Sequence, residues 1–161
     1  MQVFVPAELY KEEIQACIFL IQQGGAIENP KSVVEELPRA IVIAVKRDGT
    51  DVVGVGAIKR KRPSYASGIA KSSGFLFDAN THELGYVAVK KSHRKRGISH
   101  EIAAKLLSTF QTKPLFATTS HDAMKLTLKN AGFVQRGNEW PGVKRVLSLW
   151  IKTQVSERSS S

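Results

Sequence analysis

Apolar residues recur at helical spacing in several stretches of the chain, and each stretch predicts an amphipathic helix. In the first stretch Ile14, Cys17 and Ile21 fall on one face, and Gly24 and Gly25 follow its last turn. Helices are expected from this spacing over residues 6–23, 31–37, 98–110 and 122–130. The residues between and after these helices follow a different hydrophobic pattern.

Runs rich in β-branched residues predict strands between these helices and after the last of them. They cover residues 40–46, 52–58, 83–90, 115–119 and 143–152. Asp48-Gly49 lies between the first two runs and predicts a hairpin. Residues 63–81 are rich in Ser, Gly and Ala and are expected to form a long loop, either functional or a surface excursion. The order of elements predicts a mixed α/β fold.

Length and composition predict one globular domain. The chain has 161 residues, of which 42% are hydrophobic. We expect the domain to cover residues 1–155 and residues 156–161 to form a disordered tail. No apolar run is long enough to cross a membrane and no secretory signal pattern is present, so a cytoplasmic protein without a membrane association is expected. Cys17 stands alone and lies among isoleucines, so we expect no disulfide and no metal site.

A net charge of +10 permits an anionic partner but does not identify one. Much of the excess lies in two basic runs, residues 59–62 and 90–96. Gly54-Val55-Gly56 has the spacing of a dinucleotide-binding turn, but no helix follows it, so that interpretation is weak.

The second basic run joins a predicted strand to a predicted helix and therefore predicts a phosphate site. Backbone N–H groups without partners and the helix dipole attract an anion at such a helix start. Gly97 allows the backbone to approach the anion, and Arg94, Lys95 and Arg96 add cationic side chains. The Walker pattern of nucleotide-hydrolysing enzymes is absent, so a ligand with a pyrophosphate group fits better.

These residues resemble a known family. Val87-Ala88-Val89 followed by Arg94-Lys95-Arg96-Gly97-Ile98-Ser99 is similar to the [Q/R]-x-x-G-x-[G/A] acetyl-CoA motif of the GNAT superfamily of N-acetyltransferases, with Ser99 in place of the last small residue. Residues 53–58 resemble the third strand of that superfamily, and residues 126–133 resemble its C-terminal helix, which ends in Gly-Phe. The resemblance covers residues 40–152, and it rests on the joint order and spacing of these motifs.

The resemblance implies a GNAT fold, with a central mixed, mostly antiparallel sheet, a splayed strand and helices on both faces. It implies that acetyl-CoA is the cosubstrate and that the acetyl group passes directly to a primary amine. The pantetheine arm would lie along Val87, Ala88 and Val89, whose main-chain groups the splay leaves free. The pyrophosphate would lie on the amides of Arg94, Lys95, Arg96, Gly97, Ile98 and Ser99.

The resemblance also points to two catalytic candidates. Glu83 lies where protein-lysine-acetylating members carry a glutamate as general base; the alternative is a structural ion pair with Lys59 or Arg60. Leu128 stands where many members carry a tyrosine that protonates the CoA thiolate. His121, at the start of the same helix, could donate that proton instead, or make only structural bonds.

The acceptor is not named by the sequence. The strands over 52–58 and 83–89 are expected to be adjacent and antiparallel, which brings residues 59–62 near Glu83. We therefore expect a protein or small-molecule acceptor with negative charge near its amine; a solvated strand end is the alternative. Two other functions remain open. One is acetylation of aminoacyl-tRNA, which the charge would suit, and the other is a non-catalytic acetyl-CoA-binding module.

Overall fold

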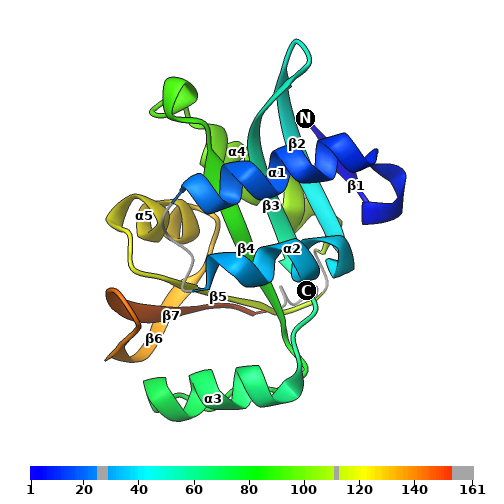
Figure 1. Cartoon of the computed structure of the whole chain (residues 1–161). Helices are drawn as coiled ribbons and strands as arrows, with labels where there is room; N and C mark the ends of the chain where they lie inside the picture. Colours follow the sequence, from blue (N-terminus) through cyan, green and yellow to red (C-terminus); the bar gives the residue numbers. More distant parts are fainter. Residues whose placement is uncertain (25–28, 111–112, 154–161) are drawn as a thin grey trace, which may run out of the picture.

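The computed structural model describes residues 1–24, 29–110 and 113–153. Its strands are β1 (Gln2–Phe4), β2 (Val42–Asp48), β3 (Asp51–Lys59), β4 (His82–Val89), β5 (Leu115–Thr119), β6 (Val134–Pro141) and β7 (Val146–Lys152). Within the described ranges they form one seven-stranded sheet in the order β1-β2-β3-β4-β5-β7-β6 (Figure 1). Every neighbouring pair is antiparallel except β4 and β5, which are parallel. The predicted mixed, mostly antiparallel sheet is therefore confirmed.

Helices cover both faces of this sheet. They are α1 (Lys11–Gln23), α2 (Val33–Glu36), α3 (Pro63–Ser73), α4 (Ile98–Thr109) and α5 (Asp122–Asn130), and short 3₁₀ turns precede α1 and flank α2. Figure 1 shows α1 and α2 crossing one face of the sheet, with α4 behind it. One core lies under α1 and α2 and a second lies under α4 and α5, so the predicted helices on both faces are confirmed.

The central strands are apolar because they are buried on both faces. Alternate residues of β2, such as Ile43 and Ala44, belong to the two different cores. On α1, Cys17 and Ile21 are fully buried against the first core, and Ile14 and Ile18 are partly buried beside it, as the helical spacing predicts.

Glycines in β3 allow α4 to lie close to the sheet. A Cβ atom on Gly54 would lie 2.9 Å from Ile98, and one on Gly56 would lie 2.4 Å from Ile102. Neither distance is compatible with a side chain larger than hydrogen unless the helix moves away. The Gly-x-Gly spacing in this strand therefore serves helix packing.

Three parts of the sequence prediction are wrong. Residues 63–73 form α3 and not a loop: Pro63 starts the helix, the small side chains of Ala66 and Ala70 are buried, and Gly74 ends it with a φ of 74°. Strands β1 and β6 were not predicted. The last strand begins at Val146, three residues later than expected, because the chain turns there from β6 into β7.

The predicted tail, residues 156–161, lies outside the described residues, and Gly25 does too. Among the residues that are described, no helix is both long and apolar enough to span a membrane.

The sheet opens between β4 and β5. These strands pair only at His82–Leu115 and Glu83–Phe116, next to the start of each strand, and then part. On its other edge β4 carries a bulge, where Tyr86 and Val87 oppose the single residue Gly56 of β3. Tyr86 has a φ of 55°, a strained value for a bulky residue, which is common where a strand is redirected near a functional site. The predicted splayed strand is confirmed.

Candidate active site

Beyond Glu83, the edge of β4 that faces the opening pairs with no other strand that the structure describes. Lys90 N donates to Val53 O at 2.8 Å, so the neighbouring residue Val89 points its own N–H and C=O away from β3. Val87, two residues earlier, belongs to the bulge and lies along the same opening, where it lines a cavity. The Val89 carbonyl accepts a hydrogen bond of 3.1 Å from Arg94 Nε, so the following basic loop folds back over this edge.

The basic loop ends in a set of backbone donors without partners. From Lys95 to His100 no backbone N–H group donates to any residue that the structure describes. Lys95 and Gly97 both have left-handed backbone conformations, with φ values of 64° and 76°, and Gly97 caps the start of α4. Such a curl, followed by a helix N-terminus, concentrates N–H dipoles on one point and makes an anion site.

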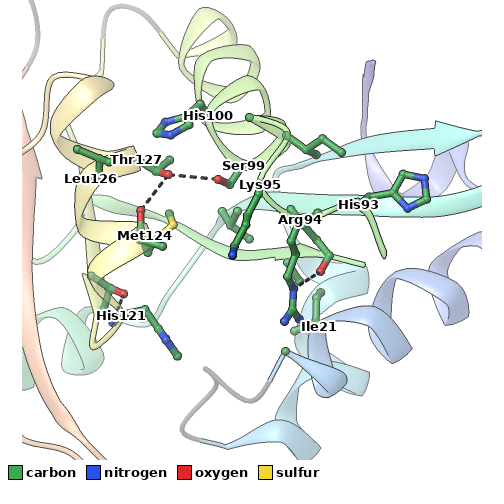
Figure 2. Close-up of a pocket in the computed structure, with 18 residues that line it drawn as sticks. Ile21, His93, Arg94, Lys95, Ser99, His100, His121, Met124, Leu126 and Thr127 are labelled. Carbon is green, nitrogen blue, oxygen red and sulfur yellow. Dashed lines mark hydrogen bonds between the residues drawn. The ribbon is translucent and has the colours of Figure 1, made fainter. Parts of the chain in front are cut away.

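An open cavity of about 490 Å³ joins the edge of β4 to this loop. Of the residues predicted to hold the cofactor, it is lined by Val87, Ala88, Val89, Arg94, Lys95, Gly97, Ile98 and Ser99. Figure 2 shows Arg94, Lys95 and His121 extending toward the same open space. Arg96 does not line it and is exposed to solvent. The structure therefore brings most of the predicted cofactor residues together around one cavity.

The cavity also has walls that the sequence did not indicate. Ile21 and Gly24, at the end of α1, line it on one face of the sheet. Met124 and Thr127 of α5 line it on the other face, so the cavity passes through the opening between β4 and β5. Thr127 Oγ1 lies 3.2 Å from Ser99 Oγ and ties α5 to the start of α4 (Figure 2). The three-residue spacing of Met124 and Thr127, which places both on one face of α5, was the signal in the sequence that could have indicated this wall.

Leu128, which stands at the position of the usual tyrosine, does not face the cavity. Its side chain is fully buried in the core under α4 and α5. A tyrosine at this position would overpack the core, so the missing hydroxyl cannot be restored by a simple replacement.

His121 lines the cavity at the start of α5 and lies beside the guanidinium group of Arg145. Its ring nitrogens lie 3.3 and 3.4 Å from Arg145 Nη1. Burial, followed by the charges of Arg145 and Arg94, lowers the pKa of His121 below its ordinary value. At neutral pH the imidazole is therefore more fully neutral than an ordinary histidine.

Glu83 does not line this cavity, but it lies where the opening begins. The residue is 3% exposed, and its Oε1 lies 3.1 Å from Lys59 Nζ on the neighbouring strand. This ion pair was the structural alternative in the sequence analysis. The same oxygen has no hydrogen-bond partner among the described residues, so the carboxylate keeps an acceptor site unused.

Other residues with possible chemistry have structural surroundings. Cys17 is fully buried, and burial raises the pKa of its thiol to about 12, which keeps it protonated. His93 lies in the basic loop before α4, named the phosphate loop below after its predicted ligand. It pairs with Asp48 at 2.8 Å and ties this loop to the β2–β3 hairpin. Within the described part of the chain, no three His, Cys, Asp or Glu side chains gather as metal ligands would.

This geometry agrees with comparisons to known proteins. The model of the acetyltransferase (GNAT) family matches residues 8–133, which is most of the chain. The protein therefore belongs to the GNAT acetyltransferase family. No curated protein matches it in sequence.

Solved structures of GNAT proteins share the fold over nearly the whole chain. An acetyltransferase of the GNAT family from Streptococcus agalactiae has 14% identity and a TM-score of 0.70, with 96% of each chain covered. The yncA protein of Salmonella typhimurium, solved with its cofactor acetyl-CoA, has 16% identity and a TM-score of 0.70, with 100% of this chain and 98% of that chain covered. A ribosomal-protein-alanine N-acetyltransferase from Brucella melitensis has 17% identity and a TM-score of 0.66, with 95% and 99% covered.

Proposed function

We propose that this acetyltransferase moves an acetyl group from acetyl-CoA to a primary amine on a protein or a small molecule. The observation that carries the proposal is the continuous cavity from the unpaired edge of β4 to the unpaired amides at the start of α4. A pantetheine arm has amide groups that can pair with a free strand edge, and a pyrophosphate suits a helix N-terminus. The match with the GNAT family supports the same assignment.

In this proposal the residues of the cavity bind and orient the cosubstrate. The main-chain groups of Val87 and Val89 hold the pantetheine arm, and Arg94 and Lys95 add charge beside the pyrophosphate. Arg96 is exposed outside the cavity, so it attracts the pyrophosphate only through its long-range charge. Acetyl-CoA supplies an activated acyl group, and no covalent intermediate on the protein is needed.

The attacking amine must lose a proton, because an alkyl amine is mostly protonated near neutral pH and the resulting ammonium has no free electron pair. We assign this proton to Glu83, whose Oε1 is ion-paired with Lys59 but accepts no hydrogen bond from the described residues, and which lies at the start of the opening. The proton reaches Glu83 directly or through a water molecule. In the free protein the charge of the Glu83 carboxylate is balanced by Lys59, and in the complex the charge of the bound acceptor adds to that balance.

His121 is the proposed donor to the departing thiolate. Its lowered pKa leaves an imidazole that is neutral near pH 7, so it can donate an N–H hydrogen bond but carries little of the acidic, charged form. A CoA thiolate is also stable enough to leave without a full proton transfer. We therefore expect the contribution of His121 to turnover to be small.

Replacement of His121 by alanine tests this expectation. His121→Ala should keep kcat within about tenfold of the wild type at pH 7, and His121→Gln should restore part of any loss because it keeps an N–H donor. The measurement is steady-state release of free CoA thiol. A loss of a hundredfold or more, with an activity that rises as pH falls, would instead make a charged His121 an essential acid.

Turnover itself separates an enzyme from a non-catalytic acetyl-CoA-binding module. The protein is incubated with acetyl-CoA and a panel of primary amines, and acetylated products are identified by mass spectrometry. We expect acetylated amine and free CoA in equal amounts. Tight acetyl-CoA binding with no amine product, across small amines, peptides and aminoacyl-tRNA, would overturn the proposal.

A further inference from the structure

A second cavity, of about 710 Å³, lies at the end of β3, away from the phosphate loop. Its walls carry cationic side chains from Arg39 and from the run Lys59–Arg62, against the carboxylates Glu35 and Glu36. Binding of the cosubstrate at the first cavity does not use any of these residues. The first basic run of the sequence therefore surrounds a separate space.

The two lysines of this cavity are already balanced. Lys59 Nζ lies 3.1 Å from Glu83 Oε1, and Lys61 Nζ contacts Glu36 Oε1. Both ammonium groups also lie over aromatic rings, Lys59 at 4.0 Å from Tyr86 and Lys61 at 4.4 Å from Tyr65. These contacts hold the lysines in place and leave little of their charge for a ligand.

Glu36 is held in its charged form by the same arrangement. Burial acts to raise its pKa, but hydrogen bonds from Lys61 and Ser32, together with the charges of Lys61 and Lys59, outweigh burial and lower the pKa. The balance between the lysines and the carboxylates around them therefore persists across the neutral pH range.

The three arginines of the cavity have no such partners. The side chains of Arg39, Arg60 and Arg62 take part in no hydrogen bond or ion pair with the residues that the structure describes. The field of Arg60 reaches His82, where it adds to burial in lowering the pKa of the imidazole. Guanidinium groups bind phosphate and carboxylate through paired N–H donors, so three of them around one cavity form a receptor for an oxyanion.

The position of the cavity links it to acetyl transfer. Lys59 lines the cavity and is the register partner of Glu83, beyond which β4 and β5 part. Tyr65 also lines it, and its ring lies 6.3 Å from that of Phe116, the residue of β5 that pairs with Glu83. The charge of Glu83, followed by burial, raises the pKa of Tyr65. A ligand in this cavity therefore approaches the opening from the side opposite to the phosphate loop.

We propose that Arg39, Arg60 and Arg62 bind an oxyanion, a phosphate or a carboxylate, that the amine acceptor carries in addition to its amine. The acceptor is then a small anionic amine whose charged group lies in the second cavity and whose amine lies toward Glu83. This inference rests on the proposed acetyltransferase function and narrows its acceptor class. Helix α3, which the chain inserts between β3 and β4, supplies the wall that contains Ser64 and Tyr65.

Matched pairs of amines test the proposal. Ethanolamine is compared with O-phosphoethanolamine, and β-alaninamide with β-alanine, so that each pair differs in one oxyanion and the two pairs separate phosphate from carboxylate. We expect the wild type to favour the anionic member of at least one pair by about 10- to 100-fold in kcat/KM. The variant Arg39→Gln/Arg60→Gln/Arg62→Gln should lose this preference through a higher acceptor KM, with unchanged affinity for acetyl-CoA.

A control variant separates local binding from the overall field of the protein. Lys11→Gln/Lys105→Gln/Lys129→Gln removes the same charge from exposed lysines that take part in no ion pair among the described residues and line neither cavity. It should keep the preference for the anionic amine. Equal kcat/KM within both pairs, or a preference that survives in the triple arginine variant, would overturn the proposal.

A binding measurement keeps this test independent of turnover. Inorganic phosphate is titrated into the protein saturated with CoA, which occupies the phosphate loop, and binding is followed by NMR chemical shifts of the backbone. Shifts around residues 59–65 that vanish in the triple arginine variant support the oxyanion site even if no amine in the panel is acetylated, in which case the proposed function fails alone. If neither phosphate nor acetate, titrated in the same way, causes shifts there, the oxyanion site is wrong, whatever the turnover.

Discussion

Replacing Gly97 by glutamate is expected to abolish the stabilisation of the protein by acetyl-CoA. In the wild type, acetyl-CoA at a hundredfold excess over its dissociation constant should stabilise the fold by about 3 kcal/mol, seen as a higher Tm. Gly97 caps α4 with a φ of 76°, and the space around it is open, so a glutamate side chain there carries its charge to the unpaired amides of the loop. That carboxylate would occupy the site proposed for the pyrophosphate or repel the pyrophosphate from it.

Gly74→Glu is the matched control for this substitution. Gly74 has a similar left-handed φ of 74° and ends α3, and neither Gly74 nor any residue of α3 lines the first cavity. Both variants should lose stability to a comparable extent, because a residue with a Cβ atom pays about 1–2 kcal/mol for that conformation. Only Gly97→Glu should lose the response to acetyl-CoA. A response that survives in Gly97→Glu would place the cosubstrate elsewhere.

Glu83→Gln is expected to lower kcat by about 10²- to 10⁴-fold, the usual range for loss of a general base, and to leave acetyl-CoA affinity unchanged. Part of the loss should be recovered at high pH, because the acceptor amine then loses its proton without help. The measurement is a pH profile of kcat for both proteins, with folding checked by circular dichroism. Equal kcat near pH 7 would remove Glu83 from the mechanism.

Lys59→Gln distinguishes a base from a partner in an ion pair. Both substitutions break the same buried contact, and each leaves one partner without its counter-charge, which destabilises a protein strongly. If Glu83 serves only to balance Lys59, the two variants should lose activity alike. If Glu83 is the base, Lys59→Gln keeps the carboxylate and should retain much more activity than Glu83→Gln.

The central strands and the loop that leads into α4 were predictable because their signals are local. A run such as Val52–Ile58 has no reason to be so apolar unless both faces are buried, and Gly97 lies between a basic run and an amphipathic helix. Strand β6 lacked any such signal, since nearly all its residues are exposed and its pairing with β7 defines it. Helix α3 was missed because its buried stripe consists of alanine and serine, which also abound in loops.

The candidate site was predictable only on one side. Val87–Val89 and Arg94–Ser99 are neighbours in sequence and carry the family resemblance, so it could be predicted that most of them lie at one site. Ile21 and Thr127 reach the same cavity from distant helices, and their contribution depends on how those helices pack on the sheet. Two roles for Glu83 stayed open in the sequence analysis, because the antiparallel order of the strands placed Lys59 or Arg60 beside it but gave no information on burial.

The central claim is that acetyl-CoA lies along the unpaired edge of β4 with its pyrophosphate at the start of α4. A crystal structure of the protein grown with acetyl-CoA tests it most directly. We expect the pantetheine amides to pair with main-chain groups of Val87 and Val89, and the phosphate oxygens to accept hydrogen bonds from the amides between Lys95 and His100. A complex in which the cosubstrate binds away from β4, or in which those amides contact no phosphate, would contradict the account.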